Sequence, residues 1–318
     1  MPELPEVETI ARSLARRVTG DTIQSVWIGS RPQPLKSPAA AIASTLEGKK
    51  IVDIHRAGKH IVIDLEQSDV AHSNVLQPRV ARALLPLKKT RNGSGSTPKQ
   101  ARPGNVKRIP GKKDKNAASQ AAQWIVHLGM TGRLLICEPE AEIAKHTHLV
   151  AMLASGRELR FVDPRMFGKL SVHTDTFDPG GVEPLEVDEA TFLSLFRGRK
   201  TPIKSALLNQ KLLRGVGNIY ADESLFRAGI RPRRRSSTLT RDQLRKLYRS
   251  VKEVLNEAIA LGGSSISDYV DADGEEGFFQ LQHRVYGREG EPCLVCKTPI
   301  RRIVLTGRSS HYCPTCQK

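Results

Sequence analysis

Residues 2–18 read PELPEVETIARSLARRV, and this stretch sets the first element of the fold. Its apolar side chains recur every three or four residues, as on one face of a helix, and they are Val7, Ile10, Leu14 and Val18. Pro5 would stand in the first turn, where its missing N–H does no harm, and Glu6 and Glu8 favour the positive end of the helix. We therefore predict an amphipathic helix from Pro5 to Val18.

The same stretch carries an unusual chemical feature, because Pro2 directly follows the initiator methionine. Removal of Met1 would leave Pro2 with a free secondary amine, and the reference pKa of an α-amino group is about 7.7–8.0. Such an amine can attack a sugar aldehyde, and the resulting iminium ion withdraws electrons as lysine Schiff bases do. Glu3 stands beside it, where a carboxyl group can move protons. Pro2 and Glu3 are therefore candidate catalytic residues.

Short strand-like segments follow this helix, separated by turns that contain Gly, Pro or charged residues. They span residues 23–28, 49–55, 60–65, 123–128, 133–137, 147–153, 157–162 and 168–173. Many short strands of this kind are typical of a β-sandwich or barrel. We predict an α+β chain that begins, over residues 1 to about 185, with a helix-capped and largely antiparallel β-sandwich.

The pattern changes to helices after Gly180-Gly181, with helices predicted over 189–197, 202–213, 219–228 and 240–261. Between the second and third of these, residues 214–218 read Arg-Gly-Val-Gly-Asn. Glycines let a backbone approach a ligand closely, and N–H groups at a helix start favour phosphate. The turn is either a phosphate-binding element or an ordinary connection between helices, and the nearby Arg199, Lys200 and Lys204 favour phosphate.

Four of the five cysteines fall near the end of the chain, as Cys293, Cys296, Cys313 and Cys316. Two Cys-x2-Cys pairs with this separation predict one four-thiolate zinc site. Two local disulfides are the alternative, and they would need an oxidising compartment. Cys137 lies in an apolar run and reads as a buried small hydrophobe.

The charge of the chain is strongly positive, with 50 Lys and Arg against 33 Asp and Glu. A net charge of +17 predicts attraction to a polyanion, and nucleic acid, a ribosome or a membrane surface would all fit. Residues 77–120 hold twelve Lys or Arg and one acidic residue, so we interpret about 73–122 as a basic insertion, either DNA-engaging or a tolerated loop. The sequence has no apolar run of membrane-spanning length and no signal-peptide segment, which predicts an intracellular protein without a membrane partner.

Several single residues stand in motifs that would expose them. Arg165 and Phe167, in Asp-Pro-Arg-Met-Phe-Gly, follow a predicted strand, where a ring could wedge a base step and a guanidinium could read a base. Met130, in His-Leu-Gly-Met-Thr-Gly, could supply a second wedge, although each of these residues taken alone is more often core or surface filler. Lys59 follows Gly58 in a turn, and Arg308 lies between the zinc-binding pairs at a predicted hairpin tip.

Taken together, these motifs resemble the bacterial formamidopyrimidine-DNA glycosylase family over nearly the whole chain apart from the insertion. The resemblance rests on five separated motifs: the opening PELPEVET, HLGMTG, DPRMFG, GVGNIYADESLF and the tail from Val285 through Cys-Pro-Thr-Cys-Gln. It implies a helix-capped β-sandwich (residues 1–185), a helix-two-turn-helix domain with a lesion-covering loop (186–280) and a zinc-finger β-hairpin (281–318).

The resemblance also implies a function: excision of oxidised purines from duplex DNA and cleavage of the strand by β,δ-elimination. Pro2 would be the Schiff-base nucleophile, Glu3 the proton donor at the deoxyribose, and Glu6 a support of the sugar site. Lys59 and Arg308 would be the proton donors associated with the two eliminations. The expected partner is double-stranded DNA with an oxidised purine or an abasic site, the expected metal is one structural zinc, and no redox cofactor is expected.

Seven further residues match DNA-contacting positions of the family. A trio would fill the gap left by the extruded base, and the others would contact DNA; they are Met130, Arg165 and Phe167, then His146, Arg199, Lys204 and Asn218. Asn209 and Ser267 stand where the family usually shows Asp and a basic or polar residue, which leaves the lesion preference open. Two rivals therefore remain: an endonuclease VIII-like enzyme for oxidised pyrimidines, and a catalytically silent DNA-binding relative. We expect a cytoplasmic monomer.

Overall fold

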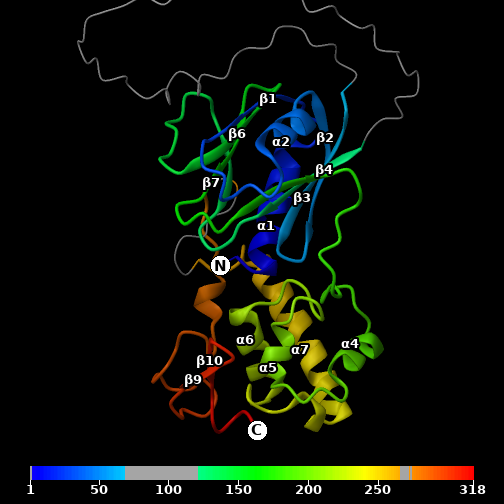
Figure 1. Ribbon diagram of the computed structural model, residues 1–318. Helices are drawn as coiled ribbons and strands as arrows, with labels where there is room; N and C mark the ends of the chain where they lie inside the picture. Colours follow the sequence, from blue (N-terminus) through cyan, green and yellow to red (C-terminus); the bar gives the residue numbers. More distant parts are fainter. Residues whose placement is uncertain (1, 69–120, 266–271, 273) are drawn as a thin grey trace, which may run out of the picture.

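The computed structural model describes residues 2–68, 121–265, 272 and 274–318. Most of the basic insertion predicted at about 73–122 lies outside the described residues, as does Ser267. The described chain forms an upper lobe that holds two β-sheets and a lower lobe of helices, with a C-terminal hairpin beside the helices (Figure 1). The prediction of an α+β chain is confirmed.

Two four-stranded antiparallel sheets build the upper lobe, in the orders β1-β6-β7-β5 and β2-β3-β4-β8. Their strands lie within about two residues of the predicted segments, as expected for boundaries read from a sequence. They are β1 (Ile23–Ile28), β2 (Lys49–Ala57), β3 (His60–Gln67), β4 (Ala122–His127), β5 (Arg133–Cys137), β6 (Thr147–Leu153), β7 (Glu158–Val162) and β8 (Lys169–His173). The prediction of a sandwich is therefore confirmed.

The first helix, α1 (Leu4–Val18), packs against β2 and β3. The side chains that predicted its apolar face, Val7 to Val18, are buried in the same hydrophobic cluster as Trp124 and Phe161 from the sheets. Helix α2 (Ala39–Leu46) was not predicted from the sequence. This helix is short and buries only Ile42 and Leu46, so it offers too few apolar positions for a periodic signal.

Four helices form the lower lobe around a second core: α4 (Glu189–Phe196), α5 (Ile203–Leu207), α6 (Asn218–Ala228) and α7 (Arg241–Ala260). The helix predicted over 202–213 is too long, because α5 ends at Leu207. Beyond it the Gln210 amide donates to the carbonyls of Leu208 and Val216 and accepts from the N–H of Gly215. These bonds stabilise a turn in place of further helix.

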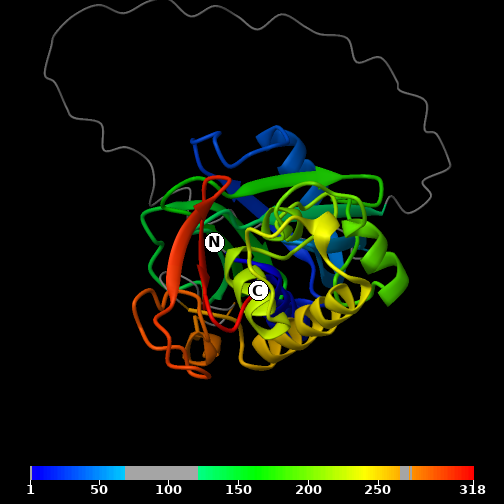
Figure 2. The same cartoon turned by 90° about the horizontal axis from the view of Figure 1, so that it is seen from below.

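The chain ends in a two-stranded hairpin of β9 (Arg301–Leu305) and β10 (Arg308–Tyr312). A short 3-10 helix at Ser236–Thr238 precedes α7, and another at Phe279–Gln282 lies between α7 and the hairpin. Seen from below, the hairpin runs alongside the helices of the lower lobe (Figure 2), and β10 contacts α6. None of the helices in the described part of the chain combines the length and apolar character that a membrane crossing requires.

Candidate active site

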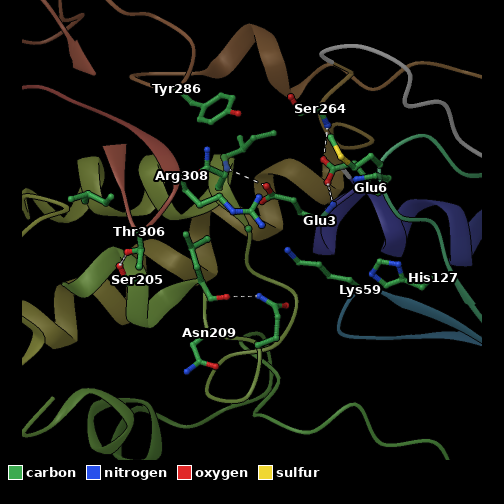
Figure 3. Close-up of a pocket in the computed structure, with 18 residues that line it drawn as sticks. Glu3, Glu6, Lys59, His127, Ser205, Asn209, Ser264, Tyr286, Thr306 and Arg308 are labelled. Atoms are coloured by element: carbon green, nitrogen blue, oxygen red, sulfur yellow. Dashed lines mark hydrogen bonds between the residues drawn. The ribbon is translucent and has the colours of Figure 1, made fainter. Parts of the chain in front are cut away.

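A cavity of about 630 Å³ lies where the N-terminus meets the helical lobe and the hairpin (Figure 3). Its walls come from segments far apart in the sequence: the start of α1, the β2–β3 turn, the start of α6 and the hairpin tip. The five residues predicted to be catalytic all line it, and they are Pro2, Glu3, Glu6, Lys59 and Arg308. Met130 and Asn218 line it as well.

Glu3 and Glu6 are buried carboxyl groups at the start of α1. Glu3 is 3% exposed, and its Oε1 accepts a hydrogen bond of 3.2 Å from the N–H of Ile219. Glu6 accepts from the N–H groups of Glu3 (2.7 Å) and Ser264 (2.8 Å) and from the Tyr220 hydroxyl. Burial raises the pKa of both carboxyl groups, and the charge of Glu3 raises the pKa of Glu6 further. A carboxyl group with a raised pKa can hold a proton near neutral pH and release it to a substrate.

The glycines of the 214–218 turn serve to bring Glu3 to the helical lobe. A Cβ on Gly217 would lie 2.1 Å from Cδ of Glu3, and a Cβ on Gly215 would lie 2.8 Å from Leu4. Gly215 also has a φ of +88°, and its carbonyl accepts from the N–H of Leu4 at 3.0 Å. The first free N–H groups of α6 thus face a carboxylate of this chain, which matches the positive end of a helix. Phosphate binding at this turn stays a prediction.

Lys59 reaches the cavity from the tight turn between β2 and β3. The turn needs Gly58, whose φ is +60° and which packs against the side chain of Arg214. Burial lowers the pKa of the Lys59 ammonium, the nearby Glu3 and Glu6 raise it, and Arg308 lowers it. Figure 3 shows the Lys59 and Arg308 side chains approaching Glu3 from opposite sides. The cavity therefore combines buried acids with cations held close to them.

Met130, Arg165 and Phe167 come from two loops that are locked together. Met130 is 40% exposed and Phe167 is 51% exposed, and the Arg165 guanidinium lies 5.0 Å from the centre of the Phe167 ring. The buried Asp163 joins the loops, because its carboxylate accepts from the Thr131 hydroxyl (2.6 Å) and from the N–H of Gly168 (2.7 Å). Exposed apolar side chains on a fixed support are suited to enter a base stack.

The remaining predicted DNA contacts are scattered. His146 is half-buried in a second hollow with Trp27, Arg31 and Lys145. Arg199 is exposed at the end of α4, where its guanidinium donates to the carbonyl of Leu195.

Lys204 differs from the expectation, because it is fully buried. Its ammonium donates to Asp222 (2.8 Å) and to the carbonyl of Ser309 (2.6 Å), so it is not available to a phosphate. The lysine was predicted as a DNA contact because it matches a DNA-contacting position of the family, and the local sequence gives no sign of its buried partner Asp222, eighteen residues away.

The cavity is also lined by residues that were not predicted as site residues, and His127, Tyr286 and Ser264 are among them. Nδ1 of His127 accepts the N–H of Gly129 at 3.1 Å, and burial lowers the pKa of the ring to about 4. The ring is thus neutral and presents its Nε2–H as a donor. His127 and Tyr286 belong to motifs that supported the resemblance, whereas Ser264 had no local signal, because it reaches Glu6 only through the fold.

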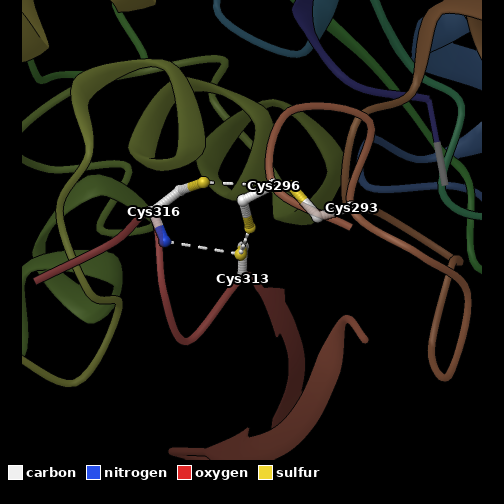
Figure 4. Close-up of side chains that lie close together, drawn as sticks. All are labelled: Cys293, Cys296, Cys313 and Cys316. Carbon is white, nitrogen blue, oxygen red and sulfur yellow. Dashed lines mark hydrogen bonds between the residues drawn. The ribbon is translucent and has the colours of Figure 1, made fainter. Parts of the chain in front are cut away.

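The four terminal cysteines form one cluster, with their sulfur atoms within 4.8 Å of one another (Figure 4). The Sγ atoms of Cys293 and Cys316 are 3.9 Å apart, and those of Cys296 and Cys313 are 3.4 Å apart. A tetrahedral site with Zn–S bonds of about 2.3 Å has S···S edges of about 3.8 Å. All four are free thiols, contrary to the disulfide alternative. The donor set fits one structural zinc ion, which the four thiolates would hold at the base of the hairpin.

Family models match three parts of the chain. The formamidopyrimidine-DNA glycosylase N-terminal domain matches residues 1–81 and 102–170, the H2TH domain of the same glycosylase matches 181–270, and the zinc finger found in FPG and IleRS matches 290–318. The chain belongs to the formamidopyrimidine-DNA glycosylase family.

Individual relatives agree along the whole length. A formamidopyrimidine-DNA glycosylase of Solibacter usitatus is 42% identical, with all of both chains covered. The crystal structure of the Thermus thermophilus family member superimposes with a TM-score of 0.73 at 34% identity, covering 99% of this chain and 98% of that one. The Lactococcus lactis Fpg in complex with DNA that contains an oxidised pyrimidine gives a TM-score of 0.76 at 30% identity, with both chains fully covered.

Membership in this glycosylase family makes the chain a DNA repair enzyme, and lyase activity at abasic sites is a trait of the family. The zinc finger match and the cysteine cluster agree on one structural zinc.

Proposed function

We propose that this chain excises oxidised purines from duplex DNA with Pro2 as the nucleophile and then cleaves the strand by β,δ-elimination. The observation that carries the proposal is the grouping of Pro2, Glu3, Lys59 and Arg308 around one cavity. A nucleophilic amine, a buried acid and two cations are the groups that this chemistry needs.

The first step forms a bond between the Pro2 nitrogen and C1′ of the damaged nucleotide, while the bond from C1′ to the base breaks and the proton lost by the amine leaves with the base. Glu3, whose raised pKa favours its protonated form, gives a proton to the sugar ring oxygen as the ring opens. The product is an open sugar linked to Pro2 as an iminium ion. Extrusion of the damaged nucleotide from the duplex costs a few kcal/mol in lost stacking and base pairing.

The iminium ion then acidifies the proton on C2′, since it can accept the electron pair that this proton leaves behind. Loss of that proton expels the 3′ phosphate, and a second elimination expels the 5′ phosphate. Lys59 lies close enough to Glu3 to lower its pKa, and Arg308 lies close enough to Lys59 to lower that of the ammonium, so both cations are placed to move protons and to stabilise the departing phosphates. Water finally releases the sugar fragment and restores the amine.

Met130, Arg165 and Phe167 support the preference for purines. In this proposal their fixed loops hold the space that the extruded nucleotide vacates and contact the orphaned cytosine. The Lactococcus lactis relative was crystallised with an oxidised pyrimidine in its DNA, which keeps the pyrimidine alternative as an outcome of the test. We further propose that the protein acts as a cytoplasmic monomer, and that residues 1–185, 186–280 and 281–318 are its working units.

The decisive test is covalent trapping with borohydride on a duplex that holds 8-oxoguanine opposite cytosine. We expect an adduct between protein and DNA, and we expect Pro2→Gly, or a form that retains Met1, to diminish it greatly. Intact mass shows which form is present. An oxidised pyrimidine duplex that traps faster would favour the endonuclease VIII-like alternative. Strand nicking without any adduct would contradict the role of Pro2, and binding without nicking or trapping would favour a silent relative.

A further inference from the structure

A buried polar cluster lies behind the cavity, where the helical lobe meets the hairpin. Its centre is Asp222 in α6, which has no exposed surface. One carboxylate oxygen accepts from the Lys204 ammonium at 2.8 Å and from the Ser310 hydroxyl at 2.9 Å. The other accepts from the N–H of His311 at 2.9 Å. Every partner except Lys204 belongs to β10.

Lys204 completes the connection from the other side. Its ammonium, 1% exposed, donates to the carbonyl of Ser309 at 2.6 Å as well as to Asp222. The three residues that follow Arg308 in the chain, Ser309 to His311, are therefore all bonded to this ion pair. Burying two charges is costly unless they are paired and their remaining lone pairs and protons make hydrogen bonds. The cluster meets this condition only when the hairpin is docked.

The hairpin tip offers few other attachments to hold Arg308 in place. Thr306 and Gly307, with φ values of 49° and 75°, make the tight turn that leads into Arg308. Close to this turn the helical lobe contributes a hydroxyl contact of 2.6 Å between Ser205 and Thr306. The Asn218 amide adds a contact of 3.3 Å to the Ser309 hydroxyl. The zinc cysteines fix the opposite end of β10, because Cys313 directly follows Tyr312.

The same cluster supports a second wall of the cavity. The ring of His311 packs edge-on against Tyr286, with 5.1 Å between the ring centres and an angle of 73°. Tyr286 lines the cavity, and the carboxylate of Asp222 lies 3.5 Å from Nδ1 of His311. A shift of β10 would therefore move both Arg308 and Tyr286.

We propose that Asp222, together with Lys204, is a positioning pair that fixes Arg308 against the cavity and so controls the second elimination. The inference rests on the proposed function, in which Arg308 serves δ-elimination. Asp222 does not reach the cavity itself. It acts through the backbone of β10. Without this pair, the zinc cysteines would hold β10 only at the end that follows Tyr312.

The test compares Asp222→Asn with wild-type protein on a duplex that contains an abasic site. The amide would set its NH2 group either against the Lys204 ammonium or against the N–H of His311, and so weaken the attachment. We expect the ratio of δ- to β-elimination product to fall by about 10- to 100-fold, because a displacement of about 1 Å can cost that much in rate. Borohydride trapping should change less than about threefold, since Pro2 and Glu3 are held by other contacts. Glu257→Gln, an acid-to-amide change at an exposed ion pair on α7, is the control and should leave the ratio unchanged.

Two further measurements separate positioning from misfolding. The double variant Asp222→Leu/Lys204→Met replaces the pair with apolar side chains, which is often neutral for stability, and it should lose the δ product to the same extent. Amide hydrogen exchange over 301–312 should quicken in both variants while one zinc per chain is retained. A wild-type product ratio in Asp222→Asn, or unchanged exchange, would overturn the inference, as would an equal loss of trapping and both eliminations.

Failure of the proposed function has a different signature. If wild-type protein forms no trapped adduct, the Pro2 mechanism fails. If Arg308→Gln keeps the wild-type product ratio, the role of Arg308 in δ-elimination fails and the inference about Asp222 falls with it. The exchange measurement still shows, without any substrate, whether Asp222 fastens the hairpin.

Discussion

Glu3→Gln should make the protein more stable and less active at the same time. The Glu3 carboxylate is 3% exposed, its Oε1 accepts the N–H of Ile219, and its Oε2 has no hydrogen-bond partner among the described residues. Glutamine can keep the bond to Ile219 with its carbonyl oxygen and removes the buried negative charge. An ionised acceptor that is buried without a partner costs at least about 1–3 kcal/mol, a cost that the neutral amide does not carry. We expect the variant to gain about this much free energy of unfolding at pH 8.

The gain must depend on pH in a definite direction. Burial raises the folded-state pKa of Glu3 above the unfolded value of 4.5. Between these two values the folded protein binds more protons than the unfolded chain, so its stability falls as the pH rises. The advantage of Glu3→Gln should therefore be absent below pH 4.5, grow as the pH rises through the raised pKa and then level off. The opposing effect is the loss of a negative charge near Lys59, which Glu6 partly offsets.

Thermal melting of both proteins between pH 4 and 9 measures this difference, and each kcal/mol corresponds to about 2–4 °C. Trapping and base release should fall by about 100-fold or more, as expected for the loss of a general acid. Glu257→Gln is the control, and its effect on stability should have the opposite sign. Arg227 lowers the pKa of Glu257, so this variant should lose free energy of unfolding at pH 8, by at most about 1 kcal/mol because the pair is exposed. A Glu3→Gln protein that melts lower than wild type at pH 8, or by the same margin at every pH, would refute the reasoning.

Three other outcomes follow from the geometry. Gly217→Ala should slow base release at least about 10-fold in single-turnover assays, because its Cβ would lie 2.1 Å from Glu3. Gly29→Ala is the control and should not slow it, because no atom lies closer than 3.4 Å to the added Cβ. Equal effects of the two variants would count against the contact with Glu3. Phe167→Ala should weaken binding to lesion duplex by about 1–3 kcal/mol in fluorescence anisotropy; its melting temperature should stay the same, because the ring is 51% exposed. Removal of zinc by a chelator, or Cys313→Ser, should abolish strand cleavage, since binding of a structural zinc supplies about 10–16 kcal/mol of folding free energy; metal analysis with a cleavage assay checks this, and cleavage by zinc-free protein would contradict it.

The sequence by itself determined the elements whose signal is local. The 3.6-residue repeat of Val7, Ile10 and Leu14 predicted α1, short strand-like segments bounded by turns predicted the strands, and cysteine spacing predicted the zinc site. It also singled out Pro2, because its chemistry depends on its place in the chain rather than on the fold. These features need only nearest neighbours, so they can be read without knowing what packs against them.

Only the tertiary structure decided the features that depend on partners distant in sequence. Lys204 read as a free cation, but Asp222 and Ser309 bury it. The helix predicted to reach residue 213 ends at Leu207, because Gln210 bonds a turn that local propensity does not reveal. The glycines of the 214–218 turn admit Leu4 and Glu3 from the other lobe, a contact that the motif alone does not predict. Burial and charge pairing act through space, and a one-dimensional pattern does not record which side chains the fold will bring together.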